Sequence, residues 1–140
     1  MGYTSAVLPV TSSSVNALHS STWNNGSFAV AYRSGTANYV NIYNSDAVLQ
    51  TTIFVGTTSA GTPVLGPTNA IRVACLAGGG FAVAWMKSSW TTITVTTYDS
   101  GYTAVGEVSS GQCYTMDGST PGYNFDLAAL ATGGSILVWT

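Results

Sequence analysis

Three side chains that can carry charge stand at one position of a repeated sequence pattern. In each repeat a short strand-forming segment ends in a large apolar residue, and a glycine-containing turn follows it. Counting four residues back from Trp23, Leu76 and Leu130 gives His19, Arg72 and Asp126. If the three strands line a common axis, an imidazole, a guanidinium and a carboxylate meet there and pair. The alternative is three separate polar residues at the entrances of their strands.

The remaining carboxylates point to turns and not to catalysis. Asp46 and Asp99 follow tyrosines that end two predicted strands, where an acidic side chain accepts hydrogen bonds from nearby backbone amides. Asp117 precedes a glycine in a loop of the same chemistry. The chain contains neither a Gly-x-Ser-x-Gly nucleophile turn nor a phosphate-binding loop followed by a helix. We therefore predict that the protein is not an enzyme.

Metal and cofactor chemistry are not expected either. His19 is the only histidine, and the spacing of the two cysteines, Cys75 and Cys113, fits no zinc signature. Cys75 precedes Leu76 in a predicted inner strand, whereas Cys113 lies in a predicted loop. Two states of the cysteines remain open: free thiols, with Cys75 packed as a small apolar residue, or a disulfide. We predict no metal and no cofactor.

Aromatic residues are the candidates for contact with a ligand or a partner. Trp90 stands in a predicted loop among hydroxyl-bearing residues. An aromatic ring in such surroundings is suited to stacking on a sugar ring or to docking on another protein. The alternative is packing within its own loop. The predicted contact residues are Trp90, Ser88, Ser89, Trp23 and Tyr39.

The scarcity of charge excludes several classes of partner. Charged residues make up 6% of the 140 residues, against about 25% in a typical soluble domain. The basic residues are only Arg33, Arg72 and Lys87, so there is no patch that neutralises a run of nucleic-acid phosphates. No apolar run approaches the ~20 residues of a membrane-spanning helix, and no signal-peptide pattern follows Met1. We expect no nucleic-acid partner, no membrane insertion, and a chain made in the cytosol or trimmed from a longer one.

A repeated turn organises the strands that must position these residues. Short runs rich in Val, Ile, Thr and aromatic residues alternate with Gly, Asn, Ser and Pro along the whole chain, which predicts an all-β fold. The strands that follow the three turns are predicted to begin at Phe28, Phe81 and Ile136, 53 and 55 residues apart. A repeat of this length indicates units that are each one small antiparallel sheet. Within one domain we place a repeat tail at 2–15, unit one at 16–62, unit two at 69–110 and a partial unit three at 123–140.

Units with apolar residues on both faces must stack face to face, as the blades of a propeller do. The N-terminal segment Tyr3–Val10 resembles residues 101–108, the outer part of unit two, which unit three lacks. We therefore expect it to pair with the strand Ile136–Trp139, or with the same strand of a neighbouring chain, and close the fold. Since a propeller has about four to eight blades, we expect a dimer or a trimer that shares one ring. The alternative is a compact three-sided β-prism.

One stretch of unit one resembles a known class of repeat. Residues 25–32 read Asn-Gly-Ser-Phe-Ala-Val-Ala-Tyr, and residues 40–48 read Val-Asn-Ile-Tyr-Asn-Ser-Asp-Ala-Val. This pattern resembles the β-propeller-like repeats of bacteriophage tail-fibre and other virion surface proteins, and of some bacterial adhesins. The resemblance extends over nearly the whole chain. It implies a displayed, non-catalytic module at the virion surface that contacts other virion proteins or cell-surface glycans.

The three-fold count of units and the Val-Asn-Ile-Tyr-Asn element of residues 40–44 are also similar to the mannose-binding lectins with a β-prism of three sheets. The Gln-x-Asp-x-Asn-x-Val-x-Tyr pocket of that family is absent, so no sugar-contacting residue carries over. Two hypotheses follow. The first is a structural and adhesive virion surface or fibre module, and the second is a soluble carbohydrate-binding lectin with sites in the inter-strand loops.

Overall fold

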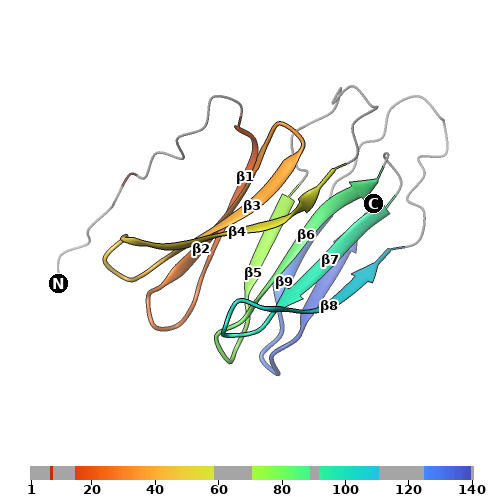
Figure 1. Cartoon of the computed structure of the whole chain (residues 1–140). Coiled ribbons are helices and arrows are strands. Elements are labelled where there is room, and N and C mark those ends of the chain that lie inside the picture. Colours follow the sequence, from red (N-terminus) through yellow and green to blue (C-terminus); the bar gives the residue numbers. More distant parts are fainter. Residues whose placement is uncertain (1–6, 8–14, 59–70, 89–91, 111–124, 140) are drawn as a thin grey trace.

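The structure, a computed structural model, describes residue 7 and residues 15–58, 71–88, 92–110 and 125–139. These residues form β-strands in three antiparallel sheets, which confirms the predicted all-β class (Figure 1). Within this part of the chain, no helix has the length and apolar character of a membrane span. The predictions for the segment Tyr3–Val10 and for Cys113 fall outside the described residues, except at Val7, which is exposed.

Each sheet is a meander in which consecutive strands pair. Sheet A contains β1 (Val15–Thr22), β2 (Phe28–Ser34), β3 (Ala37–Tyr43) and β4 (Leu49–Thr57). Sheet B contains β5 (Ile71–Cys75), β6 (Phe81–Ser88), β7 (Thr92–Tyr98) and β8 (Ala104–Ser109). Sheet C contains β9 (Phe125–Ala129) and β10 (Ser135–Trp139). The three sheets therefore correspond in chain order to the three predicted units.

The glycine turns set the register within each sheet. The turns are closed by equivalent hydrogen bonds of 2.8, 2.8 and 2.7 Å, donated by the backbone nitrogens of Trp23, Leu76 and Leu130 to the carbonyl oxygen four residues further on. The strands after the turns begin at Phe28, Phe81 and Ser135. The prediction that the third of these strands begins at Ile136 is wrong by one residue, because the third turn comprises residues 131–134 and not 132–135.

A single side chain caps the second turn of each four-stranded unit. Asp99 accepts hydrogen bonds on Oδ1 from two backbone nitrogens, both at 2.9 Å. In unit one Asn44 accepts the equivalent bonds on Oδ1, at 3.1 and 2.9 Å. Asp46 and Asp99 thus lie in equivalent turns, as predicted, but the capping side chain in unit one is Asn44 and not Asp46. Asn44 occupies the position of Asp99, and the backbone nitrogen of Asp46 is one of its donors.

Several strand boundaries differ from the predicted ones for a conformational reason. Ala47 and Tyr102 have φ angles of 60° and 64°, which residues with a Cβ rarely adopt and which belong to turns. The sequence pattern predicts strands that begin at Ala47 and Tyr102, whereas the strands begin at Leu49 and Ala104. The sequence pattern also predicts a short first strand at Ser21–Trp23, whereas β1 is longer, ends at Thr22, and leaves Trp23 in the turn.

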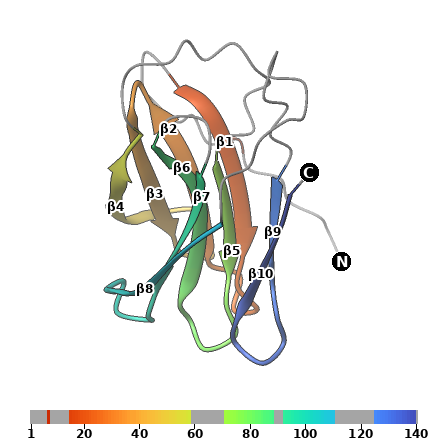
Figure 2. The same cartoon turned by 90° about the vertical axis from the view of Figure 1, so that its right-hand side faces the viewer.

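The three sheets stack in series, with sheet B in the middle (Figures 1 and 2). One buried cluster lies between sheets A and B, and its members include Ala29, Ala31, Val40, Ile42, Ile71, Val73, Phe81, Val83 and Trp85. A second lies between sheets B and C, and its members include Ala74, Leu76, Ala82, Ala84, Ile93, Phe125 and Leu127. The described sheets thus enclose two separate cores, whereas a three-sided prism has one common core.

Candidate functional sites

The first strands of the three sheets bring the predicted polar residues to equivalent positions. His19 pairs with Ala31, Arg72 with Ala84 and Asp126 with Val138, each three residues into the second strand. Arg72 Nε lies 3.4 Å from Asp126 Oδ1, and the guanidinium also lies over the ring of Phe125, 5.8 Å from its centroid. The Arg72 side chain is 17% exposed and that of Asp126 is 70% exposed. The carboxylate therefore lies largely in solvent at the edge of the stack.

His19 takes a structural position in this group. Its Nδ1 accepts a hydrogen bond of 3.1 Å from the backbone nitrogen of Val73, which requires an unprotonated Nδ1. Burial, and then the charge of Arg72, lower the pKa of His19 from its usual 6.5, while the charge of Asp126 opposes them. The imidazole is therefore neutral at physiological pH and acts as a hydrogen-bond acceptor between sheets A and B.

A second hydrogen bond repeats this arrangement one step along the strands. Ser21 Oγ accepts from the backbone nitrogen of Cys75 at 3.0 Å. β5 is the edge strand of sheet B, so the N–H groups of Val73 and Cys75 point away from β6. Side chains of β1 satisfy these edge donors, as buried backbone groups require. Among the described residues, no group of three or more His, Cys, Asp or Glu side chains is placed to hold a metal ion.

The other two basic residues have separate surroundings. Lys87 forms an ion pair with Glu107 on the exposed surface of sheet B. Arg33 is buried in β2 opposite Asn38 of β3, and burial lowers the pKa of the guanidinium. Asn38 donates through Nδ2 to Gly56 O at 3.1 Å. Within the described residues, Arg33 Nε and Nη2 and Asn38 Oδ1 have no hydrogen-bond partner. These two side chains make up a buried polar pair in sheet A.

A pocket of about 250 Å³ lies between the first turns of units one and two. These turns are at the same end of the molecule (Figures 1 and 2). The pocket is lined by Trp23, Asn24, Asn25, Ser27, Leu76, Ala77, Gly78, Gly79 and Tyr102. Its wall combines aromatic rings with amide and hydroxyl groups, a set that suits a small polar ligand with an apolar face, such as a sugar.

The geometry around Trp23 holds its side of the pocket in place. Its indole nitrogen donates to Gly80 O at 2.9 Å, and its ring meets Phe81 edge to face with centroids 6.4 Å apart. Tyr102 also contacts Phe81, with ring centroids 6.2 Å apart. Trp23 was predicted from the sequence as a contact residue, whereas Tyr102, Asn24 and Asn25 were not. The available signal was the pair of asparagines in a turn whose counterpart in unit two is glycine-rich.

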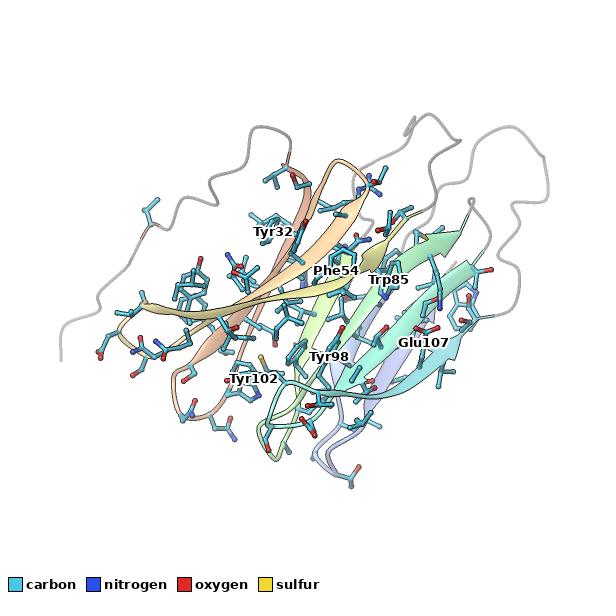
Figure 3. All side chains as sticks on the ribbon, in the orientation of Figure 1. Tyr32, Phe54, Trp85, Tyr98, Tyr102 and Glu107 are labelled. Carbon is cyan, nitrogen blue, oxygen red and sulfur yellow. The ribbon has the colours of Figure 1, made fainter. Side chains whose placement is uncertain are left out.

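Of the other predicted contact residues, the structure places Tyr39 on the outer face of sheet A. We call this surface the sheet A face; it consists of Leu18, Phe28, Val30, Tyr32, Tyr39, Tyr43 and Phe54. Tyr39 stacks on Tyr32 with centroids 5.4 Å apart and meets Phe54 at 5.7 Å. Figure 3 labels Tyr32 and Phe54 on this sheet. Leu18 and Phe54 are each 57% exposed, so part of this aromatic surface is open to solvent.

The outer face of sheet C is also apolar and open. We call it the sheet C face; it consists of Ala128, Leu130, Ile136 and Val138. Ile136 is 48% exposed and Val138 is 55% exposed. Their register equivalents are the buried alanine pairs of β2 and β6, Ala29 with Ala31 and Ala82 with Ala84. The sheet C face is therefore equivalent to the surfaces that join the sheets inside the chain.

Ser88 is the last residue of β6, and Ser89 and Trp90 lie outside the described residues. Comparison of the chain with protein-family models, with curated proteins and with solved structures finds no match. The candidate sites therefore stand on the geometry of this chain alone. They are the polar group of His19, Arg72 and Asp126 on the edge formed by β1, β5 and β9, which we call the inner edge, the pocket between the turns, and the apolar faces at the two ends of the stack.

Proposed function

We propose that this protein is a non-enzymatic structural and adhesive module of a virion surface or fibre. The observation that carries the proposal is the pair of apolar faces at the two ends of a stack of repeated sheets: the sheet C face is open at Leu130, Ile136 and Val138, and the sheet A face is open at Leu18 and Phe54. Soluble chains rarely expose contiguous apolar patches of more than a few hundred Å² unless another surface covers them. A stack of this kind is suited to packing on other surfaces, and the sequence resemblance to tail-fibre repeats supports the virion setting.

The finer form of the proposal concerns the arrangement of the sheets. Units that meander and stack in chain order, with their first strands neighbouring one another, are what the blades of a propeller do. We propose that the sheets of this chain are blades of such a ring. Its support is the equivalence of the three turns and of the three inner-edge positions described above.

Immunogold electron microscopy tests the proposed location. Antibodies raised against the purified protein are applied to intact virus particles released from cells in which the gene is expressed. We expect label on the outside of the particles, on the capsid surface or a fibre. Label confined to the cytoplasm of the cells, with bare particles, would contradict the proposal.

Carbohydrate binding is the second candidate function, and the pocket between the turns favours it. Aromatic rings of Trp23 and Tyr102 stand beside the amides of Asn24 and Asn25 in one concave site. A glycan array probed with the labelled protein tests this function, and a lectin gives discrete hits. For any glycan bound, Asn24→Ala should weaken binding by up to about tenfold, the value of one hydrogen bond. Gln50→Ala, an exposed amide in β4 outside the pocket lining, is the matched control.

A further inference from the structure

We propose that the sheet C face of one copy of this chain packs on the sheet A face of a second copy, head to tail. The inference deepens the structural part of the proposed function and rests on it. It names a second copy of this chain as the partner of the sheet A face and the sheet C face. Three features of the described residues carry it. The sheet C face is equivalent to the alanine surfaces that are buried between the sheets. The sheet A face is equivalent to the aromatic surface of sheet B that covers one of them, and the inner edge offers a hydrogen bond between the two copies.

The first feature is a surface that occurs three times and is covered twice. Ala29 and Ala31 of β2 are fully buried in the cluster between sheets A and B. Ala82 and Ala84 of β6 are fully buried in the cluster between sheets B and C. At the same register positions β10 has Ile136 and Val138, which are about half exposed. The third occurrence is more apolar than the first two, because larger aliphatic side chains replace alanine.

The second feature is the surface that receives those alanines. On sheet B, Phe81 pairs with Tyr98 across the strands and stacks on it, with centroids 4.6 Å apart and an interplanar angle of 10°. On sheet A, Phe28 pairs with Tyr43 and stacks on it, at 5.0 Å and 9°. Phe81 is fully buried beneath sheet A, whereas Phe28 is only half-buried. Sheet A thus carries on its outer face the same kind of aromatic pair that sheet B uses to receive sheet A.

The third feature is polar and lies at the inner edge. Inside the chain, the edge N–H of Val73 on β5 is satisfied by His19 of the preceding sheet. The equivalent of Val73 on β1 is Ser20, since Ser20 pairs with Val30 as Val73 pairs with Val83. The equivalent of His19 on sheet C is Asp126, whose carboxylate is largely exposed. Stacking the sheet C face on the sheet A face therefore brings the Asp126 carboxylate to the edge N–H of Ser20, a charge-assisted hydrogen bond.

The two faces differ from each other, so the contact is heterologous. The sheet C face is aliphatic and the sheet A face is mainly aromatic, so the two faces are not copies of each other. A heterologous contact either closes into a ring or continues as an open array. A closed assembly of two or three chains agrees with the ring expected from the number of units.

Charge insertion on each face tests the inference. Val138→Lys alters the sheet C face, and Leu18→Lys alters the sheet A face; both side chains are more than half exposed, so folding should persist. Val108→Lys on β8, where the valine is 72% exposed, is the matched control outside both faces. Circular dichroism confirms folding, and sedimentation equilibrium over a concentration series gives the mass. Ile136→Lys and Phe54→Lys replace any variant that fails to fold.

The expected result has three parts. The wild type and Val108→Lys have a mass of two or more chains, whereas Val138→Lys and Leu18→Lys each need at least a tenfold higher concentration to associate. A mixture of the two altered proteins forms a 1:1 complex, because each supplies the intact face that the other lacks.

Three results would overturn the inference: a monomeric wild type, an unchanged mass for either altered protein alone, or a mixture that stays monomeric while the wild type associates. The separate assays distinguish this failure from failure of the proposed function. A monomer that labels virus particles or binds glycans contradicts only the head-to-tail contact. An assembling chain that does neither leaves the contact standing and contradicts the virion role.

Discussion

Replacing Phe81 and Phe28 in parallel compares one sequence position in two environments. Both residues begin the second strand of their sheet and stack on a tyrosine of the third strand. Phe81 is fully buried between sheets A and B, and it also contacts Trp23 and Tyr102. Phe28 lies on the outer face of sheet A and is half-buried. The pair Phe81→Ala and Phe28→Ala therefore measures the free energy that the stacking of the sheets contributes.

The size of the difference follows from burial. Truncation of a fully buried phenylalanine to alanine costs about 3–5 kcal/mol, because a cavity remains among rings that cannot collapse into it. Truncation of the half-buried Phe28 removes part of one side chain's burial and one ring stack, about 1–2 kcal/mol. With a shift of about 3–4 °C per kcal/mol for a chain of this size, the melting temperature should fall by roughly 10–20 °C for Phe81→Ala and by about 3–8 °C for Phe28→Ala.

Urea denaturation followed by tryptophan fluorescence gives both free energies of unfolding, and thermal melts give the temperatures. The measurements are made at the lowest usable protein concentration, so that association through the sheet A face does not contribute. Phe81→Leu provides a milder change if the alanine variant fails to fold, and it should still cost more than Phe28→Leu. Equal losses at the two positions would refute the reasoning, since they would mean that sheet A does not cover Phe81.

Three further outcomes test other parts of the structure. The lowered pKa of His19 means that the folded state resists protonation, so the free energy of unfolding should decline as the pH falls below about 6.5. His19→Asn keeps a hydrogen-bond acceptor but does not titrate, and if its pH profile in urea melts equals that of the wild type, His19 is not the cause of the decline. Burial raises the pKa of the Cys75 thiol to about 11. In a Cys113→Ser background, the Cys75 thiol should therefore react with a disulfide reagent at pH 8 many times more slowly in the folded protein than in urea. Equal rates would show that the thiol is accessible. Gly80→Ala should lower the free energy of unfolding by about 1–3 kcal/mol, because the added Cβ would lie 2.3 Å from a backbone carbonyl oxygen of β7. Gly106→Ala is the control, because its added Cβ has no atom within 4 Å, and it should leave the melting temperature nearly unchanged.

The sequence predicted the sheets and the inner-edge register because turns act locally. A β-turn is closed by its own backbone, so counting back from Trp23, Leu76 and Leu130 places three residues at one register position without knowledge of the rest of the fold. The same locality explains the errors. Which residue of 44–46 caps the second turn depends on one hydrogen bond, and the positive φ of Ala47 and Tyr102 leaves no mark in their residue types.

The pocket between the turns was not predictable in the same way. Trp23 and Tyr102 are far apart in the sequence and come together only because sheet A stacks on sheet B with a particular offset. No periodicity within a sheet specifies that offset. It is decided by how the alanines of β2 fit the rings of β6 and β7. Aromatic residues near turns are common, so Trp23 alone could not indicate which other side chains share its pocket.

The meander order of the strands has a consequence for how the chain folds. Every described strand pairs with a strand next to it in the sequence. Each described ladder therefore closes a short loop, and such local pairing favours fast folding. Sheet A is complete once Thr57 has left the ribosome, before sheet B exists. During synthesis its alanine surface is then bare until residues 71–98 arrive to cover it. The order of synthesis is therefore also the order of burial, and a pause between units two and three would leave Ala82, Ala84 and Ile93 exposed to other nascent chains.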